Sequence, residues 1–328
     1  MGLRLFLYFV VLRNIIGYWE ALHMPALAYN VYTQTIYTTT QTILLAVLSY
    51  EALKRWVNKD NVVILLDIIC LVAIIQTVTM IMQWNGLWVG IVPRNIDKFM
   101  HLGYSNYHIT GLTSNPNMAG SLMALTLPAF FRKRRYIFIP LVLVGLWMSH
   151  SMGGMVPAIL FLSLYAFIKC PRRFKVLAVL VCAVLAIIFY LRDPNLIGGD
   201  RFKLYKTVTL NLIPMKPILG WGTGQFQHVF RLIAAQNFGY DLYNNVFRQM
   251  HNEPLQLYFE YGLVGFVLIS ASLIRIIKNG LHSKYMFILY GALMIGLINS
   301  CVNFLFHTVV AVIFLVYCAI LEGDKQCH

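Results

Sequence analysis

The sequence predicts an all-α, polytopic membrane protein: one bundle of about ten transmembrane helices with a single large loop on the outer face. Composition and charge placement carry this prediction. The chain of 328 residues is 59% hydrophobic and only 12% charged, whereas soluble domains carry roughly 25% charged residues. Its mean hydropathy is +0.69. A soluble core of this composition would leave too few polar residues to cover its surface.

Apolar runs define the candidate spans, several of which are shorter than the usual length of about 20 residues. These runs are residues 3–22, 34–51, 61–84, 112–131, 136–150, 153–169, 175–191, 253–274, 285–303 and 306–321. We expect them to form one transmembrane domain, residues 1–328, whose largest polar insert is residues 192–252.

Basic residues sit in short blocks between the apolar runs, which is the pattern of cytoplasmic loops. A cytoplasmic amino terminus places all of these blocks inside, the carboxyl terminus inside, and the loops 85–111 and 192–252 outside. The net charge of +14 therefore indicates membrane topology rather than nucleic-acid binding. The blocks are Lys54–Arg55, Arg132–Arg135, Arg172–Lys175, and Arg275 with Lys278.

The first apolar run has a second interpretation as a cleaved signal peptide. Arg13 interrupts it, and no small-residue cleavage site follows clearly. We expect a retained span.

Metal and disulfide chemistry have no sequence signature here. The six cysteines form no CxxC pair and none lies in the large loop, while the nine histidines show no HExxH or HxxxH spacing. We expect no metal site and no cofactor.

His251 differs from the other histidines because of its neighbours. It precedes Asn252, Glu253 and Pro254 where the large loop enters the span 253–274. A histidine just before a helix lies near the positive end of the helix dipole, which favours a neutral imidazole able to act as a general base. The alternative is a capping function, with Asn252 as the N-cap.

A glycine-rich run follows Pro217 and ends at Gly224. Gly220, Gly222 and Gly224 permit positive φ, and successive N–H groups there could cradle an anion. The alternative is a tight turn that packs Trp221 at the membrane interface.

Three cations of the two outer loops are candidates for binding an anionic group. Arg201, in the large loop, has the geometry to hold phosphate oxygens bidentately, although most such arginines are simply solvated. Arg94 and Lys98, in the loop 85–111, would add positive charge on the same face.

Two of the acidic residues within predicted spans, Asp67 and Glu260, are functional candidates, as ionisable groups in a membrane usually are. Asp67 lies close to a span end and could be interfacial. Glu260 follows His251 by nine residues, about two and a half helical turns, and therefore points to a neighbouring face.

Three segments together resemble the O-antigen ligase and O-antigen polymerase superfamily of bacterial inner-membrane glycosyltransferases. The first contains Asn115-Pro116-Asn117 at the opening of the span 112–131. The second runs from Arg201 to the glycine-rich run. The third begins at His251-Asn-Glu-Pro and ends at Gly265, with Glu260-Tyr-Gly-Leu-Val before it.

The resemblance implies a GT-C-like fold and metal-independent transfer of a glycan from undecaprenyl pyrophosphate to an acceptor sugar hydroxyl on the periplasmic side. Arg201 matches the arginine that binds the pyrophosphate, and His251 the histidine that activates the acceptor. The acceptor would be a glycan or a lipid A core, as in lipopolysaccharide biosynthesis, within the inner-membrane lipids. The substrate-binding residues expected on this basis are Arg94, Asn115, Asn117, Gly222, Gly224, Asn252 and Glu253.

The chain departs from the family pattern in two places. Members commonly have more amino-terminal spans than predicted here, and ligases tend to carry a second arginine near the turn that reads Ser149-His150-Ser151 in this chain. Ligase, polymerase and protein-glycosylating activities stay open, as do a transporter, for which Asp67 and Glu260 could couple protons, and an inactive or scaffolding protein.

Overall fold

The computed structural model describes residues 2–23, 26–85, 109–113, 115–132, 134–169, 171, 184, 200–230, 249–279, 283–303 and 310–323. Within these ranges the regular structure is entirely helical, which confirms the all-α prediction. The chain divides into two compact units, Met1–Arg55 with Pro194–Asn279, and Trp56–Asp193 with Gly280–His328. They are called unit 1 and unit 2 below, and each is described by itself.

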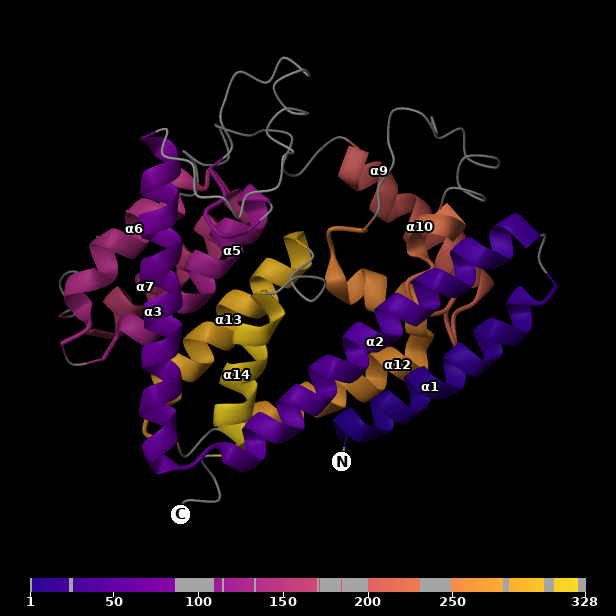
Figure 1. The fold of residues 1–328 in the computed structure, drawn as a ribbon, viewed down its shortest axis with the longest axis horizontal. Coiled ribbons are helices and arrows are strands. Elements are labelled where there is room, and N and C mark those ends of the chain that lie inside the picture. Colours follow the sequence, from indigo (N-terminus) through magenta and orange to yellow (C-terminus); the bar gives the residue numbers. More distant parts are fainter. Residues whose placement is uncertain are drawn as a thin grey trace. The chain divides into compact units, whose positions relative to one another are not determined.

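Unit 1 is built on three long helices, α1 (Gly2–Ala21), α2 (Ala26–Trp56) and α12 (Glu253–Asn279) (Figure 1). Phe6 and Val10 of α1 pack with Tyr261 of α12 in one buried cluster. The rings of Phe6 and Tyr261 meet edge to face at 5.3 Å, a favourable aromatic geometry. These contacts fix α1 along α12.

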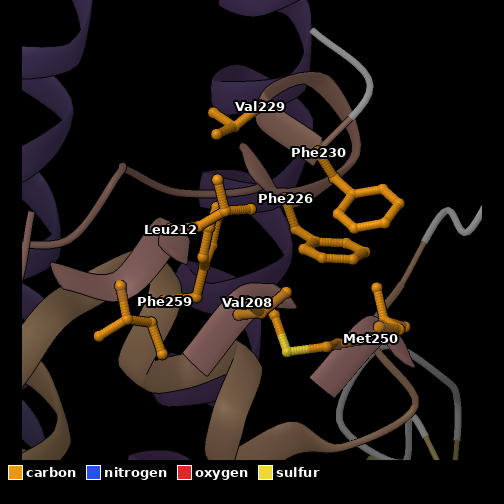
Figure 2. Close-up of a cluster of buried hydrophobic side chains, with 9 residues drawn as sticks. Val208, Leu212, Phe226, Val229, Phe230, Met250 and Phe259 are labelled. Atoms are coloured by element: carbon orange, nitrogen blue, oxygen red, sulfur yellow. The ribbon is translucent and has the colours of Figure 1, made fainter. Parts of the chain in front are cut away.

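The large loop of unit 1 is itself folded. Its described part forms α9 (Asp200–Thr207), a π-helical turn (Val208–Leu212), a 3-10 turn (Ile213–Met215) and the short α10 (Phe226–Val229). Figure 2 shows the buried side chains that hold these pieces on α12, including Val208, Leu212, Phe226, Met250 and Phe259. An apolar core under a polar loop gives its side chains fixed positions.

Unit 2 contains α3 (Lys59–Trp84), α5 (Pro116–Thr126), α6 (Ile139–Met148), α7 (Met152–Lys169), α13 (Met286–Val302) and α14 (Val310–Gly323). Short 3-10 turns follow α5 at Leu127–Phe130 and precede α6 at Tyr136–Phe138. Helices α5 and α7 approach most closely where Gly154 faces Gly120, since a Cβ on Gly154 would overlap the Gly120 backbone. Small residues of this kind permit close helix packing in membranes.

Helices lie in every predicted span except 175–191, a range in which only residue 184 is described. Three are long and apolar enough to cross a membrane by length and composition: Asn61–Trp84, Met152–Lys169 and Glu253–Asn279. Shorter apolar helices occupy Tyr136–Met148, Met286–Val302 and Val310–Gly323. The chain is therefore a multi-pass membrane protein.

The predicted span 112–131 starts too early. Residues 109–113 belong to a loop, and α5 begins only at Pro116 because the Asn115 side chain caps it. A 3-10 turn then replaces the α-helix from Leu127 onward, where Pro128 removes one backbone donor.

Asp67 of α3 forms ion pairs, while its interfacial position stays a prediction. Its carboxylate pairs with Arg132 and Arg135 of the basic block 132–135. Two arginines on one carboxylate join α3 to the turn that precedes α6, so Asp67 is a structural ion-pair residue of unit 2.

The Gly154–Gly120 contact generates a stability prediction. Gly154→Ala pushes a methyl group into the Gly120 backbone, and overpacking of this kind costs about 1–3 kcal/mol. Gly153→Ala, one residue earlier, meets only the end of the Asn303 side chain, which can shift more easily than the Gly120 backbone at the expense of its hydrogen bond to Ser121. Thermal unfolding in detergent is expected to show a clear loss for Gly154→Ala and a smaller one for Gly153→Ala, and equal losses would contradict the close approach.

Candidate functional site

Helix α12 is broken one third of the way along, and the glycine-rich loop fills the break. Gly262 has φ 60° and ψ −165°, a conformation that only glycine adopts readily. The backbone N–H groups of Leu263 and Val264 donate to Pro217 O at 2.9 Å and Ile218 O at 3.2 Å. The break is therefore satisfied by main-chain pairing with the loop.

The loop also donates hydrogen bonds to α12, on the amino-terminal side of the break. Trp221 N donates to Phe259 O and Gly222 N donates to Glu260 O, both at 2.9 Å. Trp221 also stacks on the Phe259 ring at 6.1 Å. The segment from Pro217 to Gly222 is thus bound through its backbone to both halves of α12.

The glycines of this run do adopt positive φ, at 70° for Gly220, 111° for Gly222 and 70° for Gly224. Gly224 N donates to Glu260 Oε2 at 2.9 Å. Since the N–H groups of Gly222 and Gly224 are both given to α12, they do not form the open anion cradle that their spacing suggested. The tight turn is the arrangement observed, and any contact of these glycines with substrate stays a prediction.

Arg13 of α1 holds the same turn from its carbonyl side. The guanidinium is 2% exposed, and it donates to Leu219 O at 3.2 Å and to Gly220 O at 3.0 Å. Glu20 accepts from Arg13 and, at 2.8 Å, from Lys216. The sequence had treated Arg13 only as an interruption of an apolar run, although a lone arginine in a span already signals a buried partner.

His251 lies directly before α12, as predicted. It has φ 53°, an uncommon backbone conformation for a residue other than glycine. Asn252 caps the helix, because its Oδ1 accepts from Leu255 N at 3.0 Å. The capping function therefore belongs to Asn252, the residue that the sequence had named as the alternative N-cap.

Helix α9 brings Arg201 to this position. Tyr205 donates from its hydroxyl to His251 O at 3.0 Å. Arg201 precedes Tyr205 by one helical turn in α9 and so shares its face. The same hydrogen bond that fixes the His251 backbone therefore directs Arg201 toward His251.

The charge of Arg201 acts on the His251 imidazole. Burial, as the larger cause, and the positive charge of Arg201 lower the pKa of His251 from its ordinary 6.5 to about 4. The imidazole is neutral at physiological pH, which agrees with the sequence-based expectation. The physical causes are burial and a neighbouring cation, where we had expected the helix dipole.

Glu253 and Asn252 complete the amino-terminal turn of α12. Glu253 is buried in the first turn of the helix, where a carboxylate is favoured by the positive end of the helix dipole. Both residues thus lie next to His251 in sequence, and both stabilise the first turn of α12.

Asn115 and Asn117 lie in unit 2, at the amino end of α5. Asn115 Oδ1 accepts from Asn117 N at 2.7 Å, and Asn117 Oδ1 accepts from the Ser151 hydroxyl at 3.2 Å. The loop before them is held by two glutamines of α3: Gln76 bonds to Thr110 O and Leu112 N, and Gln83 to both backbone groups of Gly111. Bidentate amide contacts of this kind fix the loop that presents Asn115.

The remaining predicted site positions are of two kinds. Arg94 and Lys98 lie outside the described residues. The turn that lacks the family's second arginine is described, and in it Ser149 and Ser151 are buried. Within the described ranges no group of three or more His, Cys, Asp or Glu side chains is arranged to hold a metal ion.

Residues 136–270 match the family model described as O-antigen ligase. The matched segment includes Arg201, the glycine-rich loop, His251 and the break in α12, so it contains the second and third motifs of the resemblance. The first motif, with Asn115 and Asn117, precedes it. No curated protein matches the chain.

The match supports the O-antigen ligase superfamily through residues 136–270 of this chain, and the activity of that family applies to the protein only as a proposal.

The lowered pKa of His251 has a measurable consequence. Histidine-selective nitrogen NMR of the purified protein is expected to show an imidazole that titrates near pH 4. Arg201→Ala removes one of the two causes and should raise this pKa toward 6.5, while Lys203→Ala, an exposed cation on the same helix, should leave it unchanged. A wild-type value near 6.5 would contradict the burial of His251.

The sign of the linked stability follows from the same shift. The folded pKa lies below the ordinary value of 6.5, so the unfolded chain binds more protons between about pH 4 and pH 6.5. Through His251, the free energy of unfolding therefore falls as the pH is lowered through this window.

Proposed function

We propose that this protein transfers an oligo- or polysaccharide from undecaprenyl pyrophosphate to a sugar hydroxyl of an acceptor. The reaction would take place on the periplasmic face of the bacterial inner membrane, with both termini of the chain in the cytoplasm. The observation that carries the proposal is the pairing of a neutral histidine with an arginine charge at the exit of the folded loop, inside the segment that matches the O-antigen ligase family.

The two side chains have complementary tasks in such a reaction. The acceptor oxygen attacks the anomeric carbon of the donor sugar, and the bond from that carbon to the pyrophosphate oxygen breaks. Neutral His251 takes the proton of the acceptor hydroxyl as general base. Arg201 offsets the negative charge that develops on the departing undecaprenyl pyrophosphate.

The lowered pKa keeps this base in its unprotonated form and at the same time makes it a weaker base. A histidine with a pKa near 4 is unprotonated across the physiological range and accepts the hydroxyl proton only as that hydroxyl becomes acidic in the transition state. The nearby arginine keeps the imidazole neutral while it attracts the anionic donor. One cation thus serves both groups.

The other substrate-binding residues that we propose are those that the family resemblance implies. Asn252 and Glu253 adjoin His251, so they are the nearest candidates for hydroxyl groups of the acceptor. Gly222 and Gly224 would act through the shape of their turn, and Asn115, Asn117 and Arg94 stay candidate substrate contacts on the family resemblance alone. Ligation to a lipid A core and polymerisation of repeat units share this chemistry and differ in the acceptor.

A transporter is the second candidate, because the broken helix α12 contains the buried Glu260, and discontinuous helices mark many transport sites. Two observations favour the transferase. The N–H groups of Leu263 and Val264, just after the break, are paired with the loop. Asp67, the other acid expected in a span, is bound by two arginines.

The transferase is tested with purified protein, a polyprenyl-pyrophosphate glycan and a panel of sugar acceptors. His251→Ala is expected to lower the rate of transfer by about 10²–10⁴-fold, the usual effect of losing a general base. Arg201→Ala should lower it by about 10²–10³-fold through lost charge stabilisation.

Matched controls separate these effects from general damage. His23→Ala and Lys203→Ala remove an exposed histidine and an exposed cation of the same unit and should retain wild-type transfer. Full transfer by both His251→Ala and Arg201→Ala would refute the proposed mechanism.

A further inference from the structure

A line of hydrogen bonds runs through buried side chains from the glycine-rich loop to the residue before His251. Gly224 N donates to Glu260 Oε2 at 2.9 Å, and Gln256 Nε2 donates to Glu260 Oε1 at 3.0 Å. Met250 N then donates to Gln256 Oε1 at 3.0 Å. The Glu260 and Gln256 side chains thus join the loop to the backbone that carries His251.

The two backbone N–H groups at the ends of this line determine which group donates and which accepts in each hydrogen bond. Backbone N–H groups can only donate, and both Gly224 and Met250 point an N–H inward. Glu260, with two acceptor oxygens, satisfies one of them and still accepts from an amide. The Gln256 amide must therefore turn its NH₂ toward Glu260 and its oxygen toward Met250.

Burial makes a mismatch in this line costly. Glu260 is 3% exposed, Gln256 is 4% exposed and Met250 is fully buried. Two donors that face each other at this depth destabilise the folded protein by about 1–3 kcal/mol, because no water can reach them to replace the lost acceptor. Either each hydrogen bond of the line keeps its donor and its acceptor, or the backbone at one end of the line is displaced.

The Met250 end is the one next to the proposed base. Beyond this point, Asn252 O accepts from Gln256 N at 2.9 Å and Tyr205 holds His251 O. Gln256 thus contacts the backbone on both sides of His251, through its side chain at Met250 and through its own N–H at Asn252. The φ of 53° at His251 is held between these two contacts.

We propose that Glu260 is a positioning residue for His251, acting through the Gln256 amide on the Met250 N–H. The catalytic meaning of this position rests on the proposed function, whereas the hydrogen-bond line itself stands on the geometry. Glu260 has a task in the membrane-spanning part of α12 that requires neither proton transfer nor substrate contact.

An exchange of the two side chains tests the proposal. In Glu260→Gln, the NH₂ groups of residues 260 and 256 face each other; turning the Gln256 amide moves the conflict to Met250, and turning the new amide moves it to Gly224. In Gln256→Glu, two buried carboxylates face each other, a contact that they can keep only by sharing one proton. In the double variant Glu260→Gln with Gln256→Glu, the new amide donates to the new carboxylate, which also accepts from Met250 N. Every donor of the line then finds an acceptor again.

Two readouts are needed, and one of them is independent of catalysis. The first is the pKa of the His251 imidazole by NMR, and the second is the rate of glycan transfer. Glu260→Gln is expected to raise the His251 pKa, because a displaced imidazole is less buried, whereas loss of the Glu260 charge alone would lower it. The same variant should lower transfer about tenfold, the effect of about 1.4 kcal/mol. The double variant is expected to restore both toward wild type, and the buried-hydroxyl control Ser272→Ala on the same helix should change neither.

Several outcomes decide the matter. A double variant no better than the worse single variant, or an unchanged His251 pKa in Glu260→Gln, would overturn the inference. If the single variants do not fold, recovery of folded protein by the double variant supports the pairing and its absence overturns it. Wild-type protein without transfer, combined with the expected pKa pattern, would refute the proposed function and leave the positioning role supported.

Discussion

The pairing between the glycine-rich loop and the break in α12 is the interaction on which the rest of unit 1 depends. A helix that unwinds in a membrane leaves backbone groups that lipid cannot satisfy. Here Pro217 and Ile218 supply the acceptors, and Trp221 and Gly222 supply donors in return. The loop cannot leave without exposing the break, and the break cannot close without displacing the loop, so the two form one structural element.

This element explains the placement of charge around it. Arg13 lies against the loop carbonyls and shares Glu20 with Lys216, while Glu260 binds the opposite side through Gly224. A positive and a negative side chain thus hold one turn from two directions. Arg201 has a different surrounding: it stands on a short helix over an apolar core and acts on a neutral histidine. The charges that hold the loop are distinct from the charge that we assign to the pyrophosphate.

The sequence predicted the parts of this arrangement that local rules determine. The polar insert, the helix start at Glu253 and the Asn252 cap follow from composition and short-range patterns, and the neutral state of His251 was expected on related grounds. The break at Gly262 was missed because the apolar residues continue across it. Glu260 was placed on a neighbouring face but not matched with Gly224, since the two meet only when the loop folds back. The start of α5 was placed too early because Leu112 and Thr113 were included in the apolar run, although they belong to a loop that Gln76 and Gln83 hold.

The central claim is that Arg201 and His251 belong to one reaction site. It is tested most directly by cryo-electron microscopy of the purified protein with a polyprenyl pyrophosphate bound. The account predicts that the pyrophosphate oxygens lie within hydrogen-bond distance of the Arg201 guanidinium, with the His251 imidazole facing the space where the first sugar would continue. A pyrophosphate bound away from Arg201, or a His251 imidazole directed into the apolar core of unit 1, would contradict it.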